Sequence, residues 1–151
     1  MNMQTANTKP HKLSTPQSVQ CECLEQTQAL GKKIAQMLKP GQLIYLNGEL
    51  GAGKTTLVAS ILSALGHEGN IKSPTFTIVE PYHFAQFEFY HFDLYRLHSI
   101  DELEEIGFRD YLANGSICII EWANKFSEQL PKPTLTIEIK HNANTRNICI
   151  S

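Results

Sequence analysis

The 151-residue chain lacks any long hydrophobic run. Its longest purely apolar stretches, Leu43–Leu46 and Ile117–Ile120, are far shorter than the roughly 20 residues that a membrane-spanning helix needs. Short apolar runs of this kind are typical of buried strands. Residues 1–19 are polar and lack the apolar core of a secretory signal. We therefore expect a flexible N-terminal tail over 1–19, no membrane span and a cytoplasmic location.

The chain also has little excess charge and no paired metal-binding residues. Its formal net charge is -2, which argues against broad binding to nucleic acids or anionic membranes, because both need a surplus of Lys and Arg. None of the four cysteines forms a C-x-x-C pair, and no two histidines are spaced to hold a metal from one helix face. We expect these cysteines and histidines to be structural.

Helices and strands are predicted to alternate along residues 20–151. Apolar spacing predicts a helix over 24–38, ended by Pro40-Gly41, then a strand over 41–47 and a helix ending at Gly66. Residues 75–80 and 87–95 suggest an antiparallel hairpin, and Ser99 with Glu102 has capping-box spacing for the next helix. Further strands are expected over 116–122, 134–140 and 146–151. The sequence thus predicts one α/β domain over 20–151, with a P-loop NTPase-like fold and a mixed β-sheet carrying helices on both faces.

A phosphate-binding motif lies between the predicted strand 41–47 and the following helix. The segment GELGAGKT, residues 48–55, satisfies G-x-x-x-x-G-K-[ST]. Its backbone amides and the helix N-terminus can hold a polyphosphate, Lys54 can neutralise charge between the β- and γ-phosphates, and Thr55 can bind Mg²⁺. The candidate ATP-binding residues are Glu49, Leu50, Gly51, Ala52, Gly53, Lys54, Thr55 and Thr56.

Two carboxylates at strand ends are candidates for the metal and the chemistry. Glu121 ends the apolar run 117–120, a pattern by which such folds place a carboxylate beside magnesium. Asp93 lies near the end of a strand that is apolar on both faces, where an unpaired carboxylate is costly to bury. A bound metal or an activated water would satisfy Asp93, and an ion pair with Arg96 is the competing explanation. The candidate catalytic residues are Lys54, Asp93 and Glu121, and the candidate metal ligands are Thr55 and Glu121.

Two related classes of P-loop protein are disfavoured. A guanine-binding protein would carry Asn-Lys-x-Asp, whereas this chain has Asn124-Lys125-Phe126-Ser127, so adenine is the better prediction. Small-molecule kinases grip phosphates with several arginines, and this chain has only Arg96, Arg109 and Arg146. None of the three has an evident position as an arginine finger, which is worth roughly 10³–10⁵ in rate, so slow basal hydrolysis is expected.

Beyond the generic motif, four segments occur in a distinctive order: GELGAGKTT, SPTFTIVEPY (73–82), YHFDLYRL (90–97) and ICIIEW (117–122). In this combination the chain resembles the TsaE family, also called YjeE, from about Thr27 to the C-terminus. That resemblance implies a bacterial ATPase of tRNA threonylcarbamoyladenosine biosynthesis. It implies the partners TsaD and TsaB, with tRNA contacted only indirectly.

The resemblance also implies roles for single residues. Thr55 and Glu121 would hold magnesium, Asp93 would be needed for ATP hydrolysis, and Thr75 would sense the γ-phosphate from a switch-type loop. Two other functions remain open: a small-molecule phosphotransferase, and a binding module controlled by nucleotide without required turnover. The aromatic residues of 82–95 are expected to pack in the core, with a partner-binding patch around Tyr82 and Phe84 as the alternative.

Overall fold

The computed structural model describes residues 16–151, and the predicted tail over 1–19 therefore lies largely outside the described residues. A mixed seven-stranded sheet forms its centre, in the order β1-β7-β6-β2-β5-β4-β3. Strands β6, β2, β5 and β4 run parallel to one another, and antiparallel strands complete both edges. The predicted mixed-sheet α/β fold is confirmed.

The strands and helices follow one another along the chain as α/β units with hairpins between them. The strands are β1 (Gln17–Cys21), β2 (Leu43–Gly48), β3 (Val79–His83), β4 (Glu88–Asp93), β5 (Ile117–Glu121), β6 (Leu135–Asn142) and β7 (Thr145–Ile150). The helices are α1 (Leu24–Met37), α2 (Lys54–Ala64), α3 (Ile100–Glu105), α4 (Phe108–Ala113) and the short 3-10 helix η1 (Ala123–Phe126).

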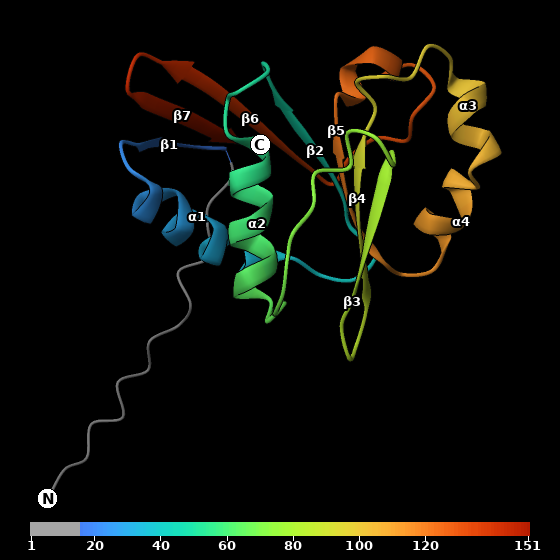
Figure 1. Cartoon of the computed structure of the whole chain (residues 1–151), viewed down its shortest axis with the longest axis horizontal. Helices are drawn as coiled ribbons and strands as arrows, with labels where there is room; N and C mark the ends of the chain where they lie inside the picture. Colours follow the sequence, from blue (N-terminus) through green and yellow to red (C-terminus); the bar gives the residue numbers. More distant parts are fainter. Residues whose placement is uncertain (1–15) are drawn as a thin grey trace, which may run out of the picture.

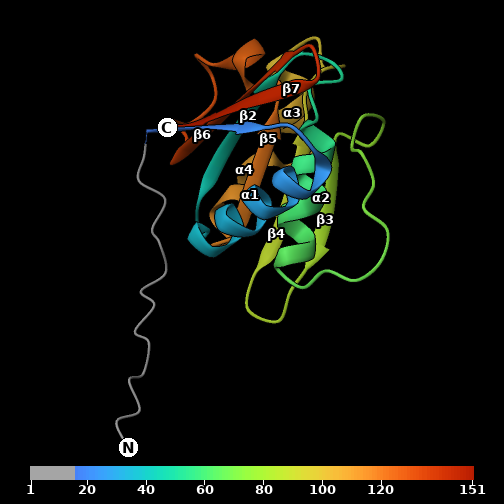
Figure 2. The ribbon, with the colours of Figure 1, turned by 90° about the vertical axis from the view of Figure 1, so that its left-hand side faces the viewer.

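Helices cover both faces of the sheet (Figures 1 and 2), α1 and α2 on one and α3 and α4 on the other. Successive residues of a strand point to opposite faces, so the central strand β5 serves two cores. Ile119 packs with α1 and α2, and Ile120 packs with α3, α4 and η1. Both side chains are fully buried. This arrangement explains why the central strands are apolar on both faces.

The N-terminal boundary of the domain lies earlier than predicted. Residues 17–19, assigned to the tail from their polarity, form the first part of β1. They pair with the end of β7, Gln17 opposite Ile150. Polarity was misleading here because β1 is an edge strand, where only one face is buried against the core.

Two local predictions in the middle of the chain are only partly confirmed: one strand begins later than expected, and a helix begins after Ser99 as expected but without the capping box. The expected strand over 75–80 starts only at Val79, because residues 74–77 form a turn and Ile78 has a left-handed backbone with φ 68°. That strand then includes Pro81, which is tolerated because β3 is the edge of the sheet. Ser99 makes no side-chain cap for α3, and the Glu102 carboxylate instead accepts a hydrogen bond from the His98 backbone N–H at 3.2 Å.

Candidate functional site

The loops that follow β2, β4 and β5 meet at one end of the parallel strands, at the upper edge of the sheet in Figure 1. Between them lies a cavity of about 310 Å³. It is lined by Leu50, Gly51, Ala52, Gly53, Lys54, Thr55, Thr56, Ser73, Thr75, Asp93, Glu121, Trp122 and Arg146. All three predicted catalytic residues and seven of the eight predicted ATP-binding residues line this one cavity. The exception, Glu49, lines a neighbouring cavity with Asn47 and Lys140.

The loop between β2 and α2 has the backbone of an anion-binding turn. Gly51 and Gly53 adopt left-handed conformations, with φ 78° and φ 103°, which side-chain-bearing residues rarely adopt. Helix α2 begins directly afterwards at Lys54, so the amides of its first turn are free to donate. The partial positive charge of the helix N-terminus favours a phosphate at this position.

Lys54 is held close to this loop by several contacts. Its Nζ donates hydrogen bonds to the carbonyl oxygens of Gly48 and Glu49, the latter at 3.1 Å. The same nitrogen lies 4.4 Å from the centre of the Trp122 ring. Burial lowers the pKa of Lys54, and the nearby carboxylates of Glu121 and Asp93 oppose this by raising it. The ammonium group is thus already positioned beside the loop, as phosphate binding requires.

Asp93 and Glu121 lie opposite each other on the parallel strands β4 and β5. Both residues are buried, with 6% and 2% of their surface exposed. Asp93 accepts hydrogen bonds from the Tyr95 backbone N–H at 2.9 Å and from the Thr75 hydroxyl at 3.4 Å. Burial raises the pKa of Asp93, the Tyr95 N–H lowers it, and the Glu121 charge raises it further. Two neighbouring buried carboxylates are costly unless a cation joins them.

No Lys or Arg side chain among the described residues lies within ion-pair distance of the Glu121 carboxylate. Its Oε1 makes no hydrogen bond, and the nearest basic atom is Nε2 of the fully buried His91, at 3.4 Å. Both ring nitrogens of His91 also lack a hydrogen-bond partner. The backbone turns sharply after Glu121, because Trp122 has a left-handed backbone with φ 61°. Buried, unsatisfied polar atoms at such a turn are typical of a functional site.

These residues fit a magnesium ion. Mg²⁺ is usually bound by one or two protein oxygens together with water and substrate phosphates, and Thr55 and Glu121 both line the cavity. Within residues 16–151 no group of three His, Cys, Asp or Glu side chains is placed to hold a metal.

The arginines occupy three different environments. Arg96 makes no ion pair with Asp93, and its guanidinium lies 4.2 Å from the centre of the Phe76 ring. The competing structural explanation for Asp93 is therefore wrong. Arg109 pairs with Glu104 at 3.0 Å on the far helices. Arg146, by contrast, reaches the phosphate-binding loop from β7.

Aromatic residues of 82–95 pack mainly inside the molecule, as predicted. Tyr82 is buried, and Phe84 stacks on Phe87 with 4.9 Å between the ring centres. The alternative of an exposed patch around Tyr82 and Phe84 is wrong. The large hydrophobic side chains that are exposed near the cavity are instead Leu50, Phe76 and Tyr95, at 67%, 79% and 42%.

Three residues at the site were given no role by the sequence analysis: His91, Trp122 and Arg146. Ser73 lies beside Thr75 in the switch-type loop that the resemblance implies. Ser73 and Thr75 share a hydrogen bond at 2.7 Å between their hydroxyls, and Thr75 then reaches Asp93. His91 and Trp122 each lie within two residues of a predicted carboxylate, so that proximity was an available signal. Arg146 had none, because it reaches the loop only through the pairing of β6 and β7.

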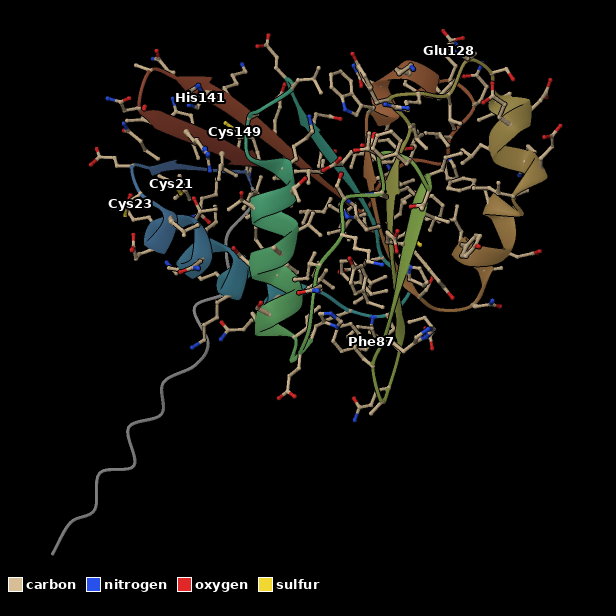
Figure 3. The ribbon with its side chains drawn as sticks, in the orientation of Figure 1. Cys21, Cys23, Phe87, Glu128, His141 and Cys149 are labelled. Carbon is tan, nitrogen blue, oxygen red and sulfur yellow. The ribbon has the colours of Figure 1, made fainter. Side chains whose placement is uncertain are left out.

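The cysteines form no disulfide in the described part of the chain. Cys21, Cys23, Cys118 and Cys149 are free thiols, and Figure 3 shows Cys21, Cys23 and Cys149 near the β1–β7 edge of the sheet. Across residues 16–151 the longest apolar helices are too short to cross a bilayer.

Fold and loop together define a single-domain α/β protein with a P-loop NTPase-like fold and a cavity where the loop meets two strand-end carboxylates. A family model described as "Threonylcarbamoyl adenosine biosynthesis protein TsaE" matches residues 21–148. The chain belongs to the TsaE family.

Individual relatives agree with this membership. A Haemophilus influenzae protein named tRNA threonylcarbamoyladenosine biosynthesis protein TsaE is 48% identical, over 78% of this chain and 78% of its own. A Bacillus subtilis protein of the same name is 41% identical, over 77% of this chain and 72% of its own. A crystal structure of Bacillus subtilis YdiB aligns with a TM-score of 0.69 and 34% identity, covering 89% of this chain and 83% of the other.

Proposed function

We propose that this protein binds ATP with Mg²⁺, hydrolyses it slowly, and supports the formation of threonylcarbamoyladenosine in tRNA together with TsaD and TsaB. The observation that carries the proposal is the pair of buried carboxylates, Asp93 and Glu121, that face a phosphate-binding loop with no described Lys or Arg side chain within ion-pair distance of either. Family membership supports the tRNA-modification role, because the relatives bear that name. The location that fits this role is the cytoplasm.

In this mechanism the chain's own residues hold and orient the reactants. The amides of residues 50–55 donate to the phosphates, and Lys54 neutralises charge that develops between the β- and γ-phosphates. Thr55 and Glu121 hold magnesium, which when bound neutralises phosphate charge as a Lewis acid. Asp93 orients the attacking water or accepts its proton, and its raised pKa suits a proton acceptor. Thr75, bonded to Asp93, can report the terminal phosphate to the loop that bears Phe76.

Slow turnover by the isolated chain follows from the position of the arginines. Arg96 and Arg109 lie outside the cavity lining, and Arg146 comes from β7, which lies on the other side of β2 from the strands that carry Asp93 and Glu121. The terminal phosphate therefore lacks an arginine finger from this chain. The exposed apolar side chains of Leu50, Phe76 and Tyr95 lie on the segments around the cavity, where a docked partner would alter the site directly.

The test is ATP hydrolysis measured with the isolated protein and with TsaD and TsaB added. We expect slow turnover alone and a clear increase with both partners. Fast hydrolysis by the isolated chain would contradict the partner dependence, and hydrolysis in neither condition would leave only a nucleotide-controlled binding module.

The Asp93→Asn variant tests whether the function needs ATP hydrolysis or only bound ATP. We expect this variant to bind ATP but to lose support of tRNA modification in a reconstituted reaction. Retention of full function would favour the binding module. A phosphotransferase is less favoured, because only one arginine is available to hold an acceptor.

A further inference from the structure

Arg146 belongs to β7, which lies two strands away from β2 in the sheet, and its side chain lies against the phosphate-binding loop. It is the second residue of β7, and strand pairing places it opposite Cys21 of β1 on one side and His141 of β6 on the other. A Cβ placed on Gly53 would lie 2.7 Å from Arg146 Nη1, 2.8 Å from Cζ and 3.1 Å from Nε. The guanidinium group therefore packs closely on Gly53, the residue just before α2.

The Arg146 guanidinium has no anionic partner in the part of the chain that the structure describes. The ion pairs among residues 16–151 join His83 to Glu88, His91 to Glu121 and Arg109 to Glu104. A half-buried guanidinium carries several donors in a planar fork that matches a phosphate. The unpaired donors at this loop are thus suited to an anion that comes from outside the chain.

Arg146 and the two carboxylates come from strands on opposite sides of β2, the strand that leads into the loop. Besides the main cavity, Arg146 lines a neighbouring hollow of about 270 Å³ together with Cys23, Leu24 and Thr56. Lys54, Asp93 and Glu121 do not line that hollow. A nucleotide with its terminal phosphate beside Asp93 and Glu121 would place its first phosphate near Thr56 and Arg146.

The charges that line the main cavity favour the same assignment. Its charged side chains are Lys54, Asp93, Glu121 and Arg146, so the two cations balance the two carboxylates. Without Arg146 the lining would carry a net negative charge and repel a polyphosphate. We propose that Arg146 is a second phosphate-binding cation that holds the phosphate nearest the nucleoside and sets nucleotide affinity. This inference rests on the proposed ATP-binding function.

The test compares ADP with a non-hydrolysable ATP analogue by isothermal titration calorimetry. Arg146→Met keeps the aliphatic stem and removes the charge. We expect this variant to weaken the binding of both ligands by the same factor, about tenfold or more. Arg146→Lys keeps the charge without the planar fork of donors, and we expect a smaller loss of affinity that is again equal for both ligands. The matched control is Arg109→Met, an exposed charge removal far from the loop, which should leave both affinities unchanged.

Each other result overturns the inference. Weaker binding of the ATP analogue alone would place Arg146 on the terminal phosphate, and unchanged binding of both ligands would show no phosphate contact. Thermal unfolding without nucleotide checks that Arg146→Met folds, and Arg146→Lys decides the question if it does not. Failure of the wild-type protein to bind either nucleotide would instead refute the proposed function.

Discussion

Asp93 illustrates a conflict between folding and chemistry at the level of one residue. Its carboxylate is buried beside Glu121, and burial raises its pKa. At a pH below the ordinary pKa of an aspartate, the Asp93 carboxyl group is neutral in both the folded and the unfolded chain. As the pH rises, the unfolded chain ionises first, so the free energy of unfolding falls until the folded-state pKa is passed. At neutral pH the nucleotide-free protein is therefore less stable than it would be without this raised pKa.

Asp93→Asn should stabilise the protein without nucleotide. Asparagine keeps an oxygen for the Tyr95 N–H and cannot ionise. A gain of about 1 kcal/mol would raise Tm by roughly 2–4 °C in a chain of this size. The measurement is Tm at about pH 7 and about pH 4, and the difference from wild type should shrink toward the lower pH. An equal difference at both values would show that ionisation is not its cause.

At the level of elements, α1 and α2 approach each other closely at Gly31. A Cβ on Gly31 would lie 2.5 Å from the Ser60 Cβ and 3.0 Å from the Ser60 backbone carbon. The two helices cover the same face of the sheet, and α2 carries the phosphate-binding loop at its N-terminus. The position of that loop therefore depends on the spacing of these helices.

Gly31→Ala should lower the free energy of unfolding although alanine is the better helix former. The gain in helix propensity is about 1 kcal/mol, whereas an extra methyl group forced into a filled contact costs typically 1–3 kcal/mol. Urea unfolding measures the net change. Gln36→Ala, at an exposed position of the same helix, should have little effect. A more stable Gly31→Ala protein would show that the helices separate without cost.

The sequence predicted those elements whose pattern is local. The loop with α2, the apolar strand β5 and the alternating strand β6 all carry their signals within a few residues, and Lys54, Asp93 and Glu121 were found in this way. Strand β1 and helix α4 were missed, because their burial depends on elements far along the chain. Arg146 escaped for the same reason, since its contact with Gly53 arises only from the strand order.

At the level of the whole molecule, the two hydrophobic cores share one sheet. Ile119 and Ile120 are neighbours on β5, and each is fully buried in a different core. Loss of packing in either core would distort the strand that holds Glu121. The two cores should therefore unfold together.

Ile119→Ala and Ile120→Ala should each lower the free energy of unfolding by about 2–5 kcal/mol, through lost burial and an unfilled cavity. Urea unfolding followed by circular dichroism and by the fluorescence of Trp122, the single tryptophan, should give the same midpoint for each variant. Two separated transitions would show that the cores are independent. The exposed Thr77→Ala variant serves as the control.

The pairing of β1 with β7 has a consequence for how the protein is made. During synthesis β1 leaves the ribosome early, but its hydrogen-bonding partner emerges only after more than a hundred further residues. Contacts of such long sequence separation form slowly, and an unpaired strand edge is prone to aggregate. Until the last strand is released, the nascent chain also lacks the arginine beside its phosphate-binding loop. We therefore expect a translating ribosome to carry a partly folded domain that cannot yet bind nucleotide tightly.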